Sequence, residues 1–434
     1  MIAKRGRQPK RKAMRILQVV HRFPPEKVGG TEIYTQSLTR QLRKRGHEVI
    51  VLYRGSSTRS PMAAPQVGKI KRYEVEARAD RDTPLPLFLS SFRNLLAERT
   101  FTQVLNRERP EVVHFQHLMG LSPRFISMAE SRRIATVLTL HDYWFLCPNA
   151  QLILPNGHSC SHDLWGFRCV HCFANRVQIP LVMLVAPLIV PLLAFRAHVL
   201  RRRLSEVDAI IAPTSWARDI FSARGSPSDK IKVIGHGVSE LEVHRSVRCK
   251  VRLPLRFAYL GGIAWQKGVH VLIRAFRDIK PGQAILKIYG DQRAFPEYTK
   301  ELQHMAEGSA VTFGGQIEHA QVGAVLTDVD ALIVPSLWPE TSCLVVQEAF
   351  AAQVPVIASA IGALREKVRH GVDGLLFTAG DAAALRALLK ELISHPSTLE
   401  ELRCNIRPQK TMSTHAAEVE ALYAQLLRKK RFSR

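Results

Sequence analysis

Apolar β-type runs alternate with helical patterns from Met14 onward, and this alternation constrains the fold more than any other feature of the sequence. The first half contains the runs MRILQVV, HEVIVLYR, EVVHFQH, IATVLTLHD, DAIIAPTS and IKVIGHGV. Several of them lack polar alternation, as expected of strands that helices cover on both faces. The order predicts parallel strands joined by crossover helices. The first helix is expected over TEIYTQSLTRQLRKRG, with Thr31 as its N-cap and Gly46 as its stop.

A second series of strand-like runs follows: LRFAYLGGI, AILKIYGD, AVTFGGQI, ALIVPS and PVIAS. A chain of 434 residues is too long for one ordinary core and fits two domains. Two successive doubly wound α/β domains place a cleft between the carboxyl ends of their sheets, where ligands of such folds bind. The predicted organisation is a basic tail (1–13), a first domain (14–238), a linker (239–252), a second domain (253–410), and a C-terminal helix with a basic tail (411–434).

The chain is strongly basic, with 62 basic and 37 acidic residues and a net charge of +25. Such a charge implies an anionic partner, which could be nucleic acid, a phosphorylated substrate or an acidic lipid surface. Both termini are either basic arms or simply solvated tails. No basic platform interleaved with aromatic residues appears, so nucleic acid is not the expected partner. No secretory signal precedes the first strand, so we expect a cytoplasmic location and mostly reduced cysteines.

One apolar run, IPLVMLVAPLIVPLLAF over Ile179 to Phe195, interrupts the alternation. Its 17 residues fall short of the roughly 20 needed to span a bilayer, and its prolines should kink or break a helix. The run is either a buried helix of the first domain or a helix that dips into one leaflet. In the second case the arginines that follow would meet anionic headgroups. These arginines are Arg196, Arg201, Arg202 and Arg203.

A cysteine-rich insert over residues 147–172 ends in a C-x2-C pair. Four thiolates complete a tetrahedral zinc site, and in a reducing compartment this spacing favours structural zinc over disulfides. Reduced thiols remain an alternative, and a nearby histidine could replace one ligand. The expected ligands are Cys147, Cys160, Cys169 and Cys172.

Three stretches together resemble one family. They are the glycine loop at Gly29 and Gly30, LGGIAWQKG, and PETSCLVVQEAFAAQVPVIAS, in which seven residues separate Glu340 from Glu348. With the double domain, they resemble the retaining glycosyltransferases of the GT-B fold from Met14 to about Leu427. The resemblance implies two Rossmann-like domains that face each other across a cleft.

Two glutamates so close in sequence suggest at first the acid and base of an enzyme that cuts sugar linkages with water. The resemblance implies instead that both hold one nucleotide-sugar donor. Glu348 would bind the ribose, and Glu340 with the loop after it would hold hydroxyls of the donor sugar. A mere helix-dipole contact for Glu348 and an exposed loop acid for Glu340 are the alternatives. By the same resemblance, the other donor-binding positions are Ser342, Cys343, Leu344, Gly315 and Ile317.

Lys267 follows a strand and precedes a helix, so it offers a cation and a helix N-terminus to a diphosphate. In the family this lysine contacts the diphosphate, and an arginine usually stands five residues earlier, where this chain has Gly262. Gly29 and Gly30 either expose amides to the donor phosphate or the acceptor, or form a simple turn. No Asp-x-Asp pair stands at a suitable strand end, so we expect no catalytic metal cofactor.

Three histidines end strands that should face the cleft: His114, His117 and His141. By resemblance His117 matches the family's active-site histidine, and His141 is a second catalytic candidate beside Lys267 and Glu340. Each histidine could instead pack in the core, His114 most readily. Asp142 is a candidate for orienting an acceptor hydroxyl.

The resemblance therefore implies a retaining glycosyltransferase, and the lack of a suitably placed Asp-x-Asp pair predicts that it is metal-independent. It would move a sugar from a nucleoside diphosphate sugar to a glycan or lipid-linked glycan at the cytoplasmic membrane face. The resemblance also implies that a donor phosphate oxygen takes the acceptor proton, so that neither carboxylate attacks. The alternatives are another GT-B enzyme, such as a nucleotide-sugar epimerase, and a non-catalytic basic scaffold that binds nucleic acid.

Overall fold

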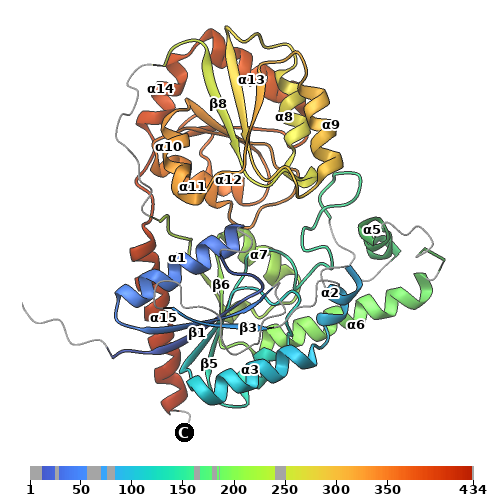
Figure 1. The fold of residues 1–434 in the computed structure, drawn as a ribbon, viewed down its shortest axis with the longest axis vertical. Coiled ribbons are helices and arrows are strands. Elements are labelled where there is room, and N and C mark those ends of the chain that lie inside the picture. The colour runs from blue at the N-terminus through green and yellow to red at the C-terminus, as the bar shows by residue number, and fades with distance from the viewer. Residues whose placement is uncertain are drawn as a thin grey trace, which may run out of the picture.

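The computed structural model describes residues 12–24, 29–55, 70–75, 84–160, 167–177, 183–184, 186–239 and 251–432. Most of the N-terminal basic tail, the last two residues of the chain, most of the linker and part of the apolar run therefore lie outside the described residues. The described chain forms two α/β units, one above the other in Figure 1.

The first unit is built on a parallel sheet of seven strands in the order β3-β2-β1-β4-β5-β6-β7. This order reverses between β1 and β4, which is the topological switch point of a doubly wound fold. The strands are β1 (Arg15–Val20), β2 (Glu48–Arg54), β3 (Lys71–Val75), β4 (Val112–Phe115), β5 (Ala135–Thr139), β6 (Ala209–Ala212) and β7 (Ile231–Val233). The helices are α1 (Gly30–Lys44), α2 (Pro84–Ser90), α3 (Leu95–Glu108), α4 (Phe125–Glu130), α5 (Phe167–Val177), α6 (Ala186–Glu206) and α7 (Ser215–Ala223).

The second unit has a six-stranded parallel sheet in the order β10-β9-β8-β11-β12-β13. Its strands are β8 (Leu255–Leu260), β9 (Ala284–Tyr289), β10 (Val311–Gly315), β11 (Ala331–Val334), β12 (Val356–Ser359) and β13 (Gly374–Phe377). Its helices are α8 (Val269–Phe276), α9 (Pro296–Ala306), α10 (Val322–Thr327), α11 (Leu344–Ala351), α12 (Ala363–Lys367), α13 (Ala382–Ser394) and α14 (Ser397–Cys404). The predicted pair of Rossmann-like domains is confirmed. The edge strands β3 and β13 were not among the predicted runs.

The C-terminal helix α15 (Met412–Phe432) leaves the second unit and packs on the first, where it runs beside the sheet in Figure 1. Its buried Tyr423 packs in one cluster with Tyr34 of α1. Helix α1 itself begins at Gly30, with Gly29 as N-cap, so the expected Thr31 cap was wrong by two positions. Gly29 has no side chain that could cap the helix. The Glu32 carboxylate in the first turn accepts a hydrogen bond from the Gly29 amide and so takes over the capping role.

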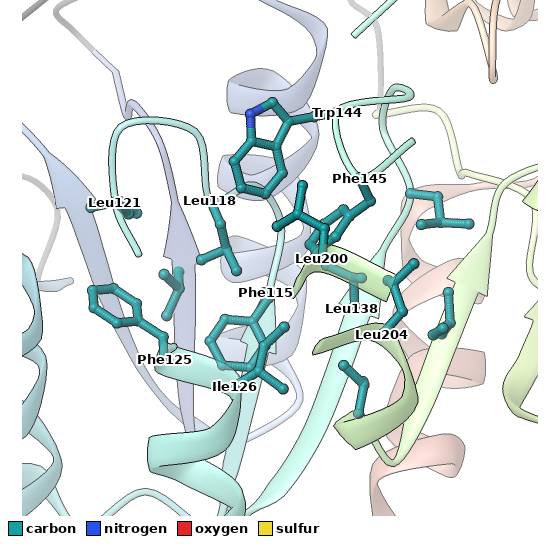
Figure 2. Close-up of a cluster of buried hydrophobic side chains, with 14 of the residues drawn as sticks. Phe115, Leu118, Leu121, Phe125, Ile126, Leu138, Trp144, Phe145, Leu200 and Leu204 are labelled. Atoms are coloured by element: carbon teal, nitrogen blue, oxygen red, sulfur yellow. The ribbon is translucent and has the colours of Figure 1, made fainter. Parts of the chain in front are cut away.

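The core of the first unit supports the loops at the carboxyl ends of β4 and β5. Figure 2 shows Leu118 and Leu121, from the loop after β4, packed in one cluster with Trp144 and Phe145, from the loop after β5. Loops built on such a core are held in fixed positions. Any site formed by these loops therefore has a rigid base.

Helix α6 contains the described end of the apolar run and continues past Pro191. It is only half buried: Leu193 faces the protein, while Leu188 is 76% exposed. The alternative of a buried helix therefore does not hold for the described end of the run. Arg196, which we expected to reach headgroups, is also buried, and donates to Ser91 Oγ and to the Trp144 carbonyl. No helix among the described residues is both long and apolar enough to cross a membrane.

Candidate active site

The loop between β11 and α11 crosses from the second unit to the first. The Pro339 carbonyl accepts a 2.6 Å hydrogen bond from the Tyr143 hydroxyl. Thr341 donates to the His141 carbonyl at 2.6 Å, and its own carbonyl accepts from Thr214 at 2.8 Å. These bonds hold the segment that contains Glu340 against the carboxyl ends of the first sheet.

Glu340 is 5% exposed and lies at the centre of this loop. Its Oε1 accepts hydrogen bonds from Lys267 Nζ (2.7 Å), Ser336 Oγ (2.8 Å) and Trp338 Nε1 (2.9 Å). Three donors on one oxygen fix the carboxylate and leave Oε2 without a hydrogen-bond partner among the described residues. The second oxygen is thus suited to accept from a ligand hydroxyl.

Lys267 stands in a short 3-10 turn before α8, and its side chain is 28% exposed. Burial lowers its pKa, but the Glu340 carboxylate more than offsets this, so the pKa is raised overall and the amine is charged. The turn reaches the loop because Gly268 has no side chain: a Cβ there would lie 1.9 Å from the Pro335 carbonyl oxygen. Gly268 also has φ +73, which favours glycine.

Glu348 lies on α11, the helix that follows the loop, and its side chain is 13% exposed. Its Oε1 lies 3.0 Å from His319 Nε2, and no hydrogen bond from a described residue reaches Oε2. A narrow pocket between the two units is lined by Glu348 and His319 on one side and by Tyr34 and Ser37 of α1 on the other. The two glutamates therefore have different partners and do not form an acid–base pair with each other.

Lys367, at the end of α12, is a second cation at this site that sequence analysis did not identify. Its Nζ donates to Gln347 Oε1 at 2.7 Å and to Ser342 Oγ at 3.1 Å. Burial lowers its pKa to about 8. Gln347 in turn donates to the His236 carbonyl of the first unit at 2.8 Å. Exposed Gly262 stands where the family usually has an arginine. Lys367 supplies a positive charge close to the loop that contains Glu340 and Ser342.

His117 follows β4 and forms an ion pair with Asp142, with 2.9 Å between Nε2 and Oδ2. Its Nδ1 accepts from the Met119 amide, so Nε2 carries the proton that is donated to Asp142. Burial lowers the pKa of His117, and the Asp142 carboxylate reverses this, so its pKa is raised. The His21 ring lies 4.4 Å from the His117 ring and its Nε2 is 3.2 Å from Glu32. Sequence analysis did not identify His21, because its position directly after β1 is the only feature of the sequence that connects it with the site.

The other two histidines differ in environment. His141 Nε2 donates to Gln116 Oε1 at 2.8 Å, and burial lowers the pKa of His141 to about 3, so the ring is neutral. His114 is fully buried between Tyr423 and Thr139, as a core histidine would be. His117 and His141 therefore border the cleft, whereas His114 has a structural role.

The remaining predicted donor positions lie at the start of α1, at the start of α11 and at the end of β10. Gly30 is close to the start of α11, because a Cβ at Gly30 would lie 3.6 Å from Leu344 Cδ1. The Gly29 amide is occupied by Glu32. Gly315 ends β10 with φ +73, and Ile317, two residues later, packs on the core of the second unit. Cys343 is the N-cap of α11 and has a left-handed backbone, φ +59.

An Asp-x-Asp sequence at Asp328 to Asp330 lies before β11, at the edge of the sheet opposite Glu340. Both carboxylates bond Arg256: Asp328 accepts from its guanidinium and Asp330 from its backbone amide. This pair is therefore structural.

The four cysteines of the insert form no disulfide bond among the described residues, and Cys172 lies near the other three. The pKa of Cys172 rises to about 12, mainly through burial and further through Cys147, Cys160 and Cys169. In the described part of the chain, however, no three His, Cys, Asp or Glu side chains are grouped closely enough to hold a metal ion. Zinc at these cysteines stays a prediction.

Comparison with known proteins identifies the family. Residues 28–240 match the model of Glycosyltransferase Family 4, and residues 252–409 match that of Glycosyl transferases group 1. The chain is 24% identical over 402 residues to a glycogen synthase of Mycobacterium tuberculosis, covering 89% of this chain and 88% of the relative.

Solved structures share the fold at low identity. Sucrose-phosphate synthase of Thermosynechococcus elongatus superposes with a TM-score of 0.70 at 19% identity, covering 96% of this chain and 100% of that one. Anabaena HepE in complex with UDP and glucose gives 0.63 at 18% identity, covering 95% and 99%. With two parallel sheets and both family matches, the chain belongs to the group 1 glycosyltransferases of the GT-B fold.

Proposed function

We propose that the chain is a retaining, metal-independent glycosyltransferase that uses a nucleoside diphosphate sugar as donor. The acceptor is a glycan or lipid-linked glycan at the inner face of the membrane. The observation that carries the proposal is the contact of Lys267 with Glu340, which puts a cation and a hydroxyl acceptor side by side in a buried loop between the two units.

The charges of the cleft suit a diphosphate donor. Lys267, in the turn before α8, and Lys367, at the end of α12, both contact the loop that contains Glu340 and Ser342. They would bind the diphosphate oxygens and stabilise the negative charge that develops as the sugar leaves. Glu348 would accept from the ribose through its unoccupied Oε2, with His319 holding Oε1.

The reaction needs no attacking carboxylate. The bond from the anomeric carbon to the diphosphate oxygen breaks, and the acceptor oxygen bonds to that carbon from the same face. The acceptor proton passes to the departing diphosphate, so charges and protons balance. Glu340 would therefore hold the donor sugar and would not attack it. Its Oε1 accepts from three donors, which fixes the carboxylate as a binding group.

The membrane part of the proposal rests on α6. Its exposed apolar residues recur every three or four positions and so share one face of the helix. Figure 1 shows α6 extending to the side of the first unit, with α2 and α5 beside it. Exposed Arg201 and Arg202 follow the apolar face and complement anionic headgroups. The apolar residues of α6 are Leu188, Leu192 and Phe195, and Leu184, which is 78% exposed, precedes the helix.

Vesicle sedimentation tests this part. Wild-type protein should sediment with vesicles that contain phosphatidylglycerol, and Leu188→Ser/Leu192→Ser should sediment much less. Leu253→Ser/Val372→Ser, which changes exposed apolar residues of the second unit, is the matched control. Equal sedimentation of both double variants would contradict a membrane contact through α6.

A thermal-shift screen against nucleotide sugars tests the donor part, because a ligand that binds the native state raises the melting temperature. We expect at least one nucleoside diphosphate sugar to do so. A basic scaffold would instead bind DNA in a salt-sensitive way and respond to no nucleotide sugar, and that result would overturn the proposal.

A further inference from the structure

A pocket of about 570 Å³ opens in the first unit, apart from the donor cleft. It lies between α2, the first turn of α3 and the loop after β4. Three arginines line it together with a set of apolar side chains. The lining residues are Arg54, Arg93, Arg99, Pro86, Leu89, Ser90, Asn94, Leu95, Leu96 and Gly120.

The cationic side of the pocket is partly built in. Arg54 ends β2 and is only 7% exposed. Its guanidinium lies so close to the loop after β4 that a Cβ at Gly120 would be 2.4 Å from Nη1. Gly120 has φ +76 and is fixed from the other side by Asn94 Nδ2, which donates to its carbonyl at 3.1 Å. A buried guanidinium is thus held against one wall.

The other two arginines are at the mouth of the pocket and are exposed. Arg93 makes one long ion pair, 3.5 Å from Glu98, and Arg99 has no ion pair within the described ranges. Arginine presents several donors in a planar fork that matches phosphate oxygens. Together the three arginines favour an anion with more than one charge.

The apolar side of the pocket faces solvent. Leu89 and Leu95 are 51% and 54% exposed, and Leu85 beside them is also exposed. The Phe92 ring stacks on the Phe195 ring of α6, with centroids 5.8 Å apart. The rim of the pocket is therefore continuous with the apolar face of α6.

The pocket also borders the catalytic side of the first unit. Gly120 lies in the same loop as His117, and the Met119 amide within this loop donates to His117 Nδ1. An acceptor headgroup bound at Arg54 would thus lie next to the loop that carries the family's active-site histidine. Its apolar portion would extend over Leu89 and Leu95 toward α6.

We infer that this pocket binds the phosphate or diphosphate group of a lipid acceptor, with the apolar chain of that lipid on the exposed leucines. The inference rests on the proposed function, because it names the chemical class of the acceptor. A sugar acceptor without phosphate would use neither the arginines nor the apolar rim.

Isothermal titration with farnesyl diphosphate, in the presence of a saturating nucleoside diphosphate, tests the inference on the full chain. Inorganic pyrophosphate and farnesol are titrated separately to represent the charged head and the apolar tail. The variants are Arg93→Gln/Arg99→Gln and Leu89→Ser/Leu95→Ser. Arg132→Gln/Arg277→Gln removes the same charge from exposed sites outside the pocket and is the control.

We expect farnesyl diphosphate to bind at least about tenfold more tightly than either part alone, and both pocket variants to lose about tenfold or more in affinity. The control should bind as the wild type does. The inference is overturned if the pocket variants bind normally, if pyrophosphate binds as tightly as farnesyl diphosphate, or if nucleoside diphosphate displaces the probe. Nucleoside diphosphate affinity is measured in the same samples. Its absence would contradict the proposed function, whereas its presence without probe binding would contradict the pocket alone.

Discussion

Lys267 Nζ donates a 2.7 Å hydrogen bond to Glu340 Oε1 across 73 positions of sequence. The same ammonium lies 5.1 Å from the centre of the Trp338 ring, which also holds Oε1. When no nucleotide sugar is bound, the Glu340 carboxylate is the anionic partner of Lys267. When a nucleotide sugar binds, Lys267 can also contact its diphosphate, while Ser336 and Trp338 keep the Glu340 carboxylate in place.

Glu348→Ala should weaken nucleoside diphosphate affinity by about tenfold, because it removes a charged acceptor of ribose hydroxyl bonds. Isothermal titration measures this. Glu340→Ala should bind nucleotide nearly normally and lose turnover of the donor sugar. Glu391→Ala, an exposed residue on α13, is the control. Nucleotide binding by Glu348→Ala that matches this control would rule out the ribose role.

Lys367 predicts a pH dependence of donor binding. Burial lowers its pKa from 10.5 to about 8, so the amine loses its charge as the pH rises through about 8. Nucleoside diphosphate affinity should therefore fall between about pH 7 and pH 9. Lys367→Met should bind more weakly at pH 7 and lose this pH dependence, whereas exposed Lys300→Met should behave as the wild type. A wild-type affinity that does not change over this range would contradict the role of Lys367.

Lys367 also affects the free energy of unfolding, and this effect changes with pH in the opposite direction to the donor affinity. Between about pH 8 and pH 10.5 the folded state binds fewer protons at Lys367 than the unfolded state does. Its contribution to the free energy of unfolding therefore rises with pH across that window.

Gln353→Gly should stabilise the protein by about 1 kcal/mol, because Gln353 has a left-handed backbone that glycine adopts without strain. Its φ is +58, just after the end of α11. Thermal unfolding measures the change. Ala352→Gly, next to it with φ −84, should destabilise instead. If both variants lower the melting temperature equally, strain at Gln353 is not the cause.

Elemental analysis tests the zinc prediction for Cys147, Cys160, Cys169 and Cys172. We propose about one zinc per chain, since four thiolates form a closed tetrahedral site. Loading would require α5 to move toward the loop after β5, because the thiols are near one another but are not grouped for a metal. Cys172→Ser should lose the zinc and exposed Cys404→Ser should keep it. Less than about 0.2 zinc per chain in the wild type would contradict the prediction.

The sequence predicted the two Rossmann-like units, and it placed Glu340 and Lys267 after strands and Glu348 close by, because apolar strand runs and strand ends are local signals. It did not predict β3 and β13. Their sequences, KRYEV and GLLF, are short or polar, and they pair only at sheet edges.

The remaining site residues depend on tertiary contacts. Lys367 reaches the loop from α12, and His319 reaches Glu348 on α11 from the turn after β10. No spacing in the sequence relates them to Glu340 or Glu348. Arg196 was misjudged for the same reason: within a basic run, only packing decides which arginine is buried.

The most direct test of the donor site is release of nucleoside diphosphate from the nucleotide sugar that the screen identifies. Wild-type protein, Lys267→Ala and Glu340→Ala are compared, with Lys300→Ala as control. We predict that both active-site variants lose about a hundredfold or more in rate, because each removes a group that acts on the leaving donor, and that the control keeps the wild-type rate. Release at the wild-type rate by Lys267→Ala, or no release by the wild type from any nucleotide sugar, would contradict the account.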